Sequence, residues 1–336
     1  MKTLRQTLTE QERVLVVDGA MGTMLQEQNP SLEDFQGHEG CNEILNVSAP
    51  EMVKQVHRAY LEVGVDGIET NTFGANFGNL AEYGIEDRIY ELAYAGAKLA
   101  REVANEFSNL HPRWVFGSIG PGTKLPTLGH TTYATLRDAY QECARGLIDG
   151  GSDALLVETS QDLLQTKAAI NGCRAAIDKS GKDLILIAQV TVETTGTMLL
   201  GSEIGAALTA LEPLGIDVIG LNCATGPAEM SEHLRQLSRS SSVMLSCMPN
   251  AGLPILESGG ARYPLTPSEL AKSLETFVAD YGLNIVGGCC GTTPAHLAEV
   301  VKKFGERKKS IPTRKISVDP GAASLYQHAS FRQENT

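Results

Sequence analysis

The sequence is 336 residues long and 42% hydrophobic, which is enough apolar material for one large buried core. Its formal net charge of −12 argues against a nucleic-acid-binding surface, because phosphate recognition requires clustered lysine and arginine. The start of the chain lacks the apolar stretch of a signal peptide, and no run of about 18 apolar residues could span a membrane. The seven cysteines are odd in number and irregularly spaced, which favours free thiols in a cytoplasmic enzyme over a disulfide scaffold.

Eight short runs rich in aliphatic residues recur along the chain, and each is followed by a loop and a helical pattern. Near-continuous apolar runs of this kind are typical of parallel strands that are buried on both faces. The predicted strands span residues 13–19, 65–71, 114–120, 153–159, 184–190, 217–223, 242–248 and 284–290.

The segments between these strands carry signals for the start of a helix. Ser48 lies three residues before Glu51, and Thr266 lies three residues before Glu269, a spacing that predicts a capping box. Eight strands alternating with helices indicate an α/β protein, with a (β/α)8 TIM barrel as the predicted fold and a doubly wound open sheet as the alternative. We expect the barrel to occupy residues 1–310.

The end of the chain has a different character. From Ile316 onward the sequence contains turn residues without a clear hydrophobic period and without a terminal helix. We therefore interpret residues 311–336 as a linker or tail, and the chain as one module of something longer.

Three cysteines fall at the ends of two predicted strands. Cys223 ends the sixth strand, and Cys289 and Cys290 end the eighth. In a (β/α)8 barrel the chemistry lies where strands end and loops begin, and these two strands flank the seventh, so we expect the three thiols around the same rim. Three thiolates suit zinc, whose catalytic sites hold three protein ligands and keep one position open.

Neighbouring glycines bear on this zinc hypothesis. Successive side chains of a strand point to opposite faces, so both members of a Cys-Cys pair reach one ion only where the backbone leaves extended geometry. We expect Gly287, Gly288 and Gly291 to supply that freedom.

Other interpretations of the thiols remain open at this point. Each cysteine taken alone could be a small buried apolar residue. Cys247 ends the seventh predicted strand and could close a structural zinc site of four cysteines, although we assign it to the core. A reversible disulfide between Cys289 and Cys290 with no bound metal is a further possibility. No histidine pairs with a cysteine at ligand spacing, so we assign the histidines no metal role.

Seven segments in order along the chain resemble one known family. Between about Arg13 and Phe304 the sequence is similar to the homocysteine-binding domain of the cobalamin-dependent methionine synthases, within the homocysteine S-methyltransferase family. The segments that carry the resemblance are DGAMGTML from Asp18, ETNTFGAN from Glu69, GSIGP from Gly117, LLVET from Leu155, GLNCATGP from Gly220, PNAGLP from Pro249 and GGCCGTTP from Gly287.

The resemblance implies a (β/α)8 barrel with Zn²⁺ on Cys223, Cys289 and Cys290 and with homocysteine as substrate. Homocysteine would bind as a zinc thiolate and receive a methyl group from methylcobalamin to give methionine. The cobalamin-binding and folate-binding domains would belong to the same full-length enzyme, and residues 311–336 resemble the linker into its folate barrel. Homocysteine methyltransferases that use betaine or S-methylmethionine share the barrel and the cysteines, so a stand-alone enzyme with one of these donors is the alternative.

The resemblance also implies a site for the amino-acid end of the substrate. Glu158 and Asp18, at the ends of the fourth and first predicted strands, match family positions that hold the amino group. Without the family, Asp18 could equally form an Asp-Gly turn, and Glu158 could be a solvated rim charge. The substrate carboxylate needs donors, and the backbone N–H groups of Gly19, Ala20 and Met21 are suitable because glycine allows close approach.

Three further polar residues, Asn250, Glu69 and Glu193, are candidates for this rim. The resemblance points to Asn250 as a fourth zinc ligand in the substrate-free state, although an Asx turn would also explain an asparagine before Ala-Gly. Glu69, after the second predicted strand, and Glu193, after the fifth, are weaker substrate-binding candidates on position alone.

Overall fold

The structure is a computed structural model that describes residues 2–10, 13–109, 111–257, 260–304 and 311–332. Eight parallel strands form one sheet in the order β1-β10-β7-β6-β5-β4-β3-β2, and a bridge between Val17 and Gly67 brings its two edges together. The strands are β1 Leu15–Val16, β2 Gly67–Glu69, β3 Trp114–Ile119, β4 Ala154–Ser160, β5 Ile185–Val190, β6 Val218–Asn222, β7 Met244–Met248 and β10 Ile285–Val286.

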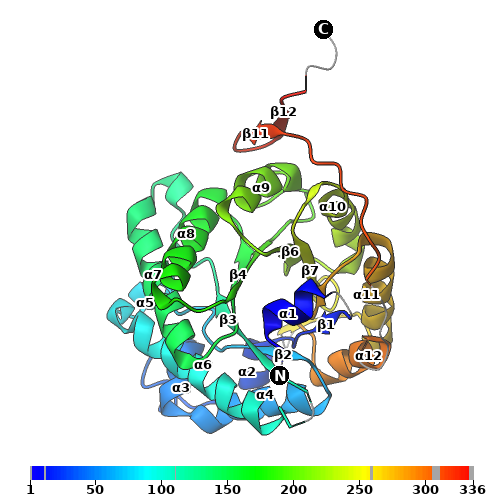
Figure 1. The fold of residues 1–336 in the computed structure, drawn as a ribbon. Coiled ribbons are helices and arrows are strands. Elements are labelled where there is room, and N and C mark those ends of the chain that lie inside the picture. The colour runs from blue at the N-terminus through cyan, green and yellow to red at the C-terminus, as the bar shows by residue number, and fades with distance from the viewer. Residues whose placement is uncertain (1, 11–12, 110, 258–259, 305–310, 333–336) are drawn as a thin grey trace.

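Helices surround the strands as an outer ring (Figure 1). α1 Leu4–Thr9 lies across one end of the barrel, inside this ring. The other helices are α2 Met21–Gln26, α3 Leu45–Ser48, α4 Pro50–Glu62, α5 Phe77–Glu82, α6 Ile89–Glu106, α7 Tyr133–Gly150, α8 Leu163–Ser180, α9 Ile204–Leu211, α10 Pro227–Ser240, α11 Pro267–Tyr281 and α12 Pro294–Phe304. Short 3-10 helices are η1 Asn42–Ile44, η2 Glu86–Arg88, η3 Pro126–Leu128 and η4 Glu212–Leu214.

The predicted (β/α)8 barrel is confirmed, and the alternative of an open sheet is wrong. Each of the eight predicted apolar runs coincides with one barrel strand, and β4 extends one residue beyond its run, to Ser160. The eighth strand is shorter than predicted, because β10 ends at Val286 and the chain then turns toward the cysteines.

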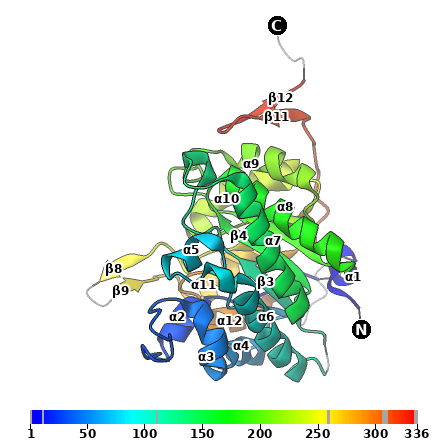
Figure 2. The same cartoon turned by 90° about the vertical axis from the view of Figure 1, so that its left-hand side faces the viewer.

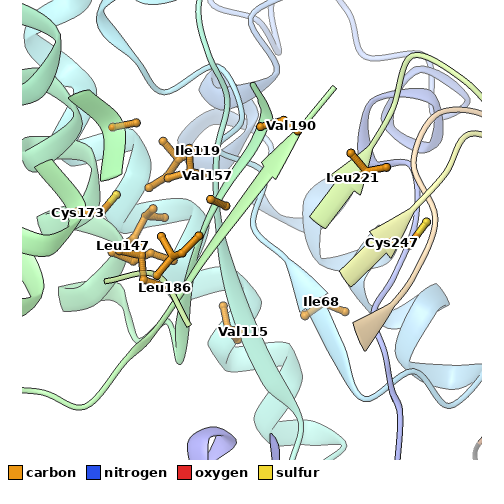
Figure 3. Packing of buried hydrophobic residues seen from close by; sticks show 14 of the residues in the cluster. Ile68, Val115, Ile119, Leu147, Val157, Cys173, Leu186, Val190, Leu221 and Cys247 are labelled. Carbon is orange, nitrogen blue, oxygen red and sulfur yellow. The ribbon is translucent and has the colours of Figure 1, made fainter. Parts of the chain in front are cut away.

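The core consists of two apolar layers separated by the sheet. In β4, Ala154 and Leu156 belong to the layer inside the barrel, whereas Leu155 and Val157 face the helices. Alternate residues of a strand point to opposite faces, and both faces are buried here, so the strands are apolar on both faces. Figure 3 shows part of the outer layer, where Leu147 and Cys173 from helices pack near strand residues.

The barrel is closed at its N-terminal end by α1. Leu4 and Leu8 are buried in the inner apolar layer. Arg5 holds the helix in place, because its guanidinium donates to Asp217 at 2.6 Å and to Asp183 at 2.6 Å. Figure 2 shows α1 and the hairpin of β8 Ile255–Glu257 and β9 Gly260–Arg262 on opposite sides of the molecule.

One of the two predicted capping boxes forms. At the start of α11, the Thr266 N–H donates to Glu269 Oε2 at 2.8 Å, and Thr266 Oγ1 accepts from the Glu269 N–H. The prediction for Ser48 is wrong, because Ser48 ends α3 and its hydroxyl donates to backbone carbonyls, while Ala49 is the N-cap of α4.

Residues 311–332 lie against the outside of the barrel near α9 and α10. The predicted irregular tail contains a hairpin of β11 Gly321–Ala323 and β12 His328–Ser330. The Glu203 N–H, at the start of α9, donates to the Tyr326 carbonyl at 2.8 Å, and the Ser317 N–H donates to the Arg239 carbonyl at 2.8 Å. The predicted boundary at residue 310 lies outside the described residues.

Membrane-spanning helices were not expected. Among the described residues, the structure contains no helix with the length and apolar character needed to cross a bilayer.

Candidate functional site

The structure brings Cys223, Cys289 and Cys290 together. Their sulfur atoms all lie within 4.8 Å of one another, and the sulfurs of Cys223 and Cys290 are 3.7 Å apart. Cys223 directly follows β6, and the adjacent pair follows β10, so the cluster lies at the C-terminal ends of the strands. All three side chains are partly buried. Three soft sulfur donors at this spacing fit a zinc ion that keeps one position open.

An unusual backbone conformation aims Cys223 at the cluster. Cys223 and Ala224 have φ values of 57° and 56°, in the left-handed region that non-glycine residues rarely adopt. The turn is held by the Cys223 N–H, which donates to the Met248 carbonyl at 3.2 Å. Such strain costs about 1–3 kcal/mol per residue and concentrates at functional sites.

Gly291 performs the role expected of it beside the Cys-Cys pair. Its φ is +76°, and the ring of Tyr263 lies directly against it. A Cβ atom at Gly291 would be 2.2 Å from Cγ of Tyr263. The glycine therefore permits both the turn and the contact with the ring.

We expected Gly287 and Gly288 to supply a backbone conformation that other residues avoid, and this prediction is wrong. Neither has a positive φ. A Cβ atom at Gly288 would lie 2.3 Å from Oγ1 of Thr292, so close packing is the constraint there.

Without a metal, the three thiols share negative charge unequally. Hydrogen bonds from Cys223 and Cys289 lower the pKa of Cys290 to about 3, and the Tyr263 hydroxyl adds to this effect. Burial raises the pKa of Tyr263 to about 12, as does negative charge on Cys290. A lowered pKa at Cys290 favours the thiolate, which is the form of cysteine that binds a divalent cation.

Cys247 does not join the cluster. Its side chain is fully buried in the outer apolar layer, and its thiol lies 3.7 Å from the sulfur of Met230 (Figure 3). The geometry thus agrees with the assignment of Cys247 to the core and does not support a closed site of four cysteines.

A cavity of about 370 Å³ opens beside the sulfur cluster. The three cysteines line it together with Glu69, Glu158, Gly19, Ala20 and Met21. Glu193, the other candidate chosen on position, is not among the lining residues.

Glu158 is buried and held by two donors. The Ser118 hydroxyl donates to its Oε1 at 2.5 Å, and the Asn222 amide donates to its Oε2 at 3.0 Å. Burial raises the pKa of Glu158 to about 7. It is not the solvated rim charge of the alternative interpretation.

Asp18 lies behind this wall of the cavity. Its exposed fraction is 1%, and its two carboxylate oxygens accept the backbone N–H of Glu69 at 3.0 and 3.1 Å. Burial raises the pKa of Asp18 well above its ordinary value.

The backbone of Gly19, Ala20 and Met21 forms another part of the wall, at the start of α2. The Ala20 N–H donates to the Thr292 carbonyl at 3.3 Å. A Cβ atom at Gly19 would be 2.4 Å from Oγ1 of Thr292, so only glycine fits there.

Asn250 is buried next to the cluster. Its side-chain oxygen accepts the Cys290 N–H at 3.1 Å. A carbonyl oxygen has two lone pairs, so this hydrogen bond leaves one available.

Two residues of the site were missed from the sequence. Asn222 directly precedes Cys223, and its place at the end of a predicted strand was the available signal. Tyr263 lies close to Cys290 only because the chain folds back after β9, and no local motif marks it.

Comparison with known proteins identifies the family. A sequence model described as "Homocysteine S-methyltransferase" matches residues 15–304. The chain belongs to the homocysteine S-methyltransferase family. The resemblance found in the sequence is thereby confirmed.

Two curated relatives of this family member are methionine synthases. That of Mycobacterium tuberculosis (strain ATCC 25618 / H37Rv) is 59% identical over 324 residues, which cover 96% of this chain and 27% of the relative. That of Mycobacterium leprae (strain TN) is 56% identical over 327 residues, with coverage of 96% and 27%. The chain thus spans about a quarter of the length of these relatives.

Solved structures agree with the fold. The metallated homocysteine methyltransferase MmuM from Escherichia coli superposes with a TM-score of 0.72 at 22% identity, covering 89% of this chain and 99% of that one. Its oxidized form gives a TM-score of 0.68 at 23% identity, with coverage of 90% and 100%.

Proposed function

We propose that this chain is the homocysteine-activating module of a methionine synthase. Cys223, Cys289 and Cys290 would bind Zn²⁺, homocysteine would bind at the open position, and methylcobalamin on another domain would donate the methyl group. The observation that carries this proposal is the cluster of three sulfurs within 4.8 Å of one another beside a cavity with buried carboxyl groups.

The chemistry requires a deprotonated sulfur on homocysteine. A free thiol has a pKa near about 8.5, and zinc, when bound, would supply the positive charge that removes its proton. A sulfur of low pKa is usually a poorer nucleophile. Three cysteine thiolates carry one more negative charge than the ion neutralises, and we expect this excess to keep the substrate sulfur electron-rich.

The cavity walls would orient the rest of the substrate. Glu158 and Asp18 would hold the ammonium group, because Glu158 lines the cavity and the buried Asp18 carboxyl lies behind that wall. The backbone of Gly19, Ala20 and Met21 would meet the carboxylate, because these three residues line the cavity at the start of α2.

Asn250 would occupy the fourth zinc position before substrate arrives. Its side-chain oxygen is fixed next to Cys290 by the hydrogen bond to the Cys290 N–H. A neutral oxygen ligand would yield to a thiolate because zinc prefers sulfur donors of this kind.

The remaining reaction would take place with partners in the same polypeptide. Because the chain spans 27% of two methionine synthases, we expect cobalamin-binding and folate-binding domains elsewhere in the full-length enzyme. Residues 1–310 would form the homocysteine barrel, and residues 311–336 would lead into the folate-binding domain. We expect the enzyme to act in the cytoplasm.

Metal content and homocysteine binding test the proposal together. Under reductant, the wild-type chain and Cys247→Ala should each bind one zinc ion and homocysteine, whereas Cys223→Ser should lose most of both. Zinc-free wild-type protein after reconstitution, or equal zinc affinity in Cys223→Ser, would refute it. Turnover with S-methylmethionine or betaine, but not with methylcobalamin, would instead identify a stand-alone methyltransferase.

A further inference from the structure

Glu69 has an unusual environment among the acidic residues of the site. It ends β2 and lines the cavity together with the three cysteines and Glu158. Its Oε1 atom is buried, and within the described part of the chain it has no hydrogen-bond partner. A buried carboxyl oxygen without a donor costs free energy, so its retention calls for a ligand that supplies one.

The neighbouring carboxyl groups differ in this respect. Glu158 accepts hydrogen bonds from Ser118 and Asn222, and Asp18 accepts the backbone N–H of Glu69. Those bonds fix the two acids in place. Glu69 is the member of this trio with a buried oxygen, Oε1, that accepts no hydrogen bond from the described residues.

The charge of the trio favours a cation. Burial raises the pKa of Glu69 well above its ordinary value, and negative charge on Glu158 and Asp18 raises it further. A bound cation would relieve this repulsion, since an opposite charge favours the ionised carboxylate. Lysine and arginine are absent from the residues that line the cavity, so the cation must come from the ligand.

We propose that Glu69 is a substrate-binding residue that accepts one N–H of the homocysteine ammonium group. The inference rests on the proposed function. A primary ammonium offers three N–H donors. Glu69 and Glu158 line the cavity, and the Asp18 carboxylate lies behind them on the backbone N–H of Glu69. β1 and β2 meet at the bridge between Val17 and Gly67, which brings Asp18 beside Glu69.

Glu69 therefore contributes to selectivity for α-amino thiols. A site built to bond a polar group discriminates strongly against an analogue that lacks it, because its buried acceptors are then left unpaired. The analogue 4-mercaptobutanoate retains the thiol and the carboxylate of homocysteine and lacks only the amine.

Binding of the two ligands to zinc-loaded Glu69→Gln tests the proposal by calorimetry. Because a charge-assisted hydrogen bond is lost, the affinity for L-homocysteine should fall by about 10-fold or more. The affinity for 4-mercaptobutanoate should change by less than about 2-fold. Zinc stoichiometry should stay at the wild-type value. Glu69→Met, which removes both acceptors, should give the same pattern, and Glu193→Gln, whose carboxyl is outside the cavity lining, should match wild type for both ligands.

Two outcomes would overturn the role of Glu69. Equal weakening of both ligands would show that Glu69 maintains the cavity in general, and unchanged homocysteine affinity would show no contact. If the zinc-loaded wild-type chain bound neither ligand, the proposed function itself would fail, which is a separate result.

Discussion

The side-chain amide of Asn222 donates a hydrogen bond to Glu158 at 3.0 Å, at the point where β6 and β4 end. The same nitrogen lies 4.0 Å from the sulfur of Cys289 and 2.8 Å from Oγ1 of Thr159. Its oxygen accepts the Thr159 N–H at 2.7 Å. Asn222 therefore joins the carboxyl wall of the cavity to the sulfur cluster.

Replacement of Asn222 should separate substrate affinity from metal affinity. In Asn222→Ala, Glu158 loses one of its two donors, so the carboxylate becomes less well positioned for the ammonium group. We expect homocysteine affinity to fall by about 10-fold, as for loss of a hydrogen bond to a charged group. Titration calorimetry on zinc-loaded protein measures this, and a loss of bound zinc of similar size would contradict the account.

The buried carboxyl of Glu158 should make stability depend on pH in the zinc-free, reduced chain. Its pKa is raised to about 7, while an ordinary unfolded glutamate titrates near about 4.3. Between these values the folded chain holds a proton that the unfolded chain has released. The free energy of unfolding should therefore decrease as pH rises through this window.

Glu158→Gln tests this pH dependence. The variant lacks the titrating group, so its free energy of unfolding should decline less between roughly pH 4.5 and 8, by a difference on the order of 1–3 kcal/mol. Asp18 and Glu69, whose pKa values are also raised by burial, remain in both proteins and act in the same direction. Parallel curves from urea unfolding for wild type and variant would show that Glu158 is not the source.

Gly291→Ala should damage the sulfur cluster. The new Cβ would lie 2.2 Å from Cγ of Tyr263, so the ring or the Cys289–Cys290 turn must move. We expect zinc affinity, measured by competition with a chelator, to fall by about 10-fold or more, since displaced ligands are costly at metal sites.

Gly129→Ala is the matched control for that variant. Gly129 has nearly the same φ, +74° against +76°, but a Cβ there meets nothing within 4 Å. Alanine at this positive φ should lower the free energy of unfolding by only about 1 kcal/mol. The zinc affinity should stay at the wild-type value. If both variants lost zinc affinity equally, the cause would be the positive φ that they share and not the contact with Tyr263.

Cys247→Ala should affect stability and leave the metal in place. The side chain is fully buried against Met230, so its truncation creates a small cavity and should cost about 1–2 kcal/mol. Zinc stoichiometry should equal that of wild type. Loss of one equivalent of zinc in Cys247→Ala would revive the closed four-cysteine site.

The barrel could be predicted from the sequence because its strands are buried on both sides. Residues such as Leu155 and Leu156 face different apolar layers, and that arrangement produces a continuous apolar run. Strand ends could not be read in the same way. β10 stops at Val286, and Gly288, two residues later, packs against Thr292. The apolar pattern of the sequence carries no information on that contact.

The sulfur cluster was predictable because its members follow two strands, β6 and β10, that flank a third, β7. The polar partners were less so. Its position after a strand made Glu69 only one of several acidic candidates. The buried Oε1 without a hydrogen-bond donor, which singles it out among the described acidic residues, is visible only in the structure. Tyr263 reaches Cys290 through the fold of the β8–β9 segment. The hairpin after residue 320 also escaped prediction, because strands of three residues have too short a pattern.

The central claim is that Cys223, Cys289 and Cys290 bind one zinc ion with a position left for the sulfur of homocysteine. X-ray absorption spectroscopy of the zinc-loaded wild-type chain, with and without homocysteine, tests this most directly. We predict three sulfur ligands and one lighter donor without substrate, and four sulfur ligands with it. A site with four sulfurs in both states, or one whose spectrum does not change when homocysteine is added, would contradict the account.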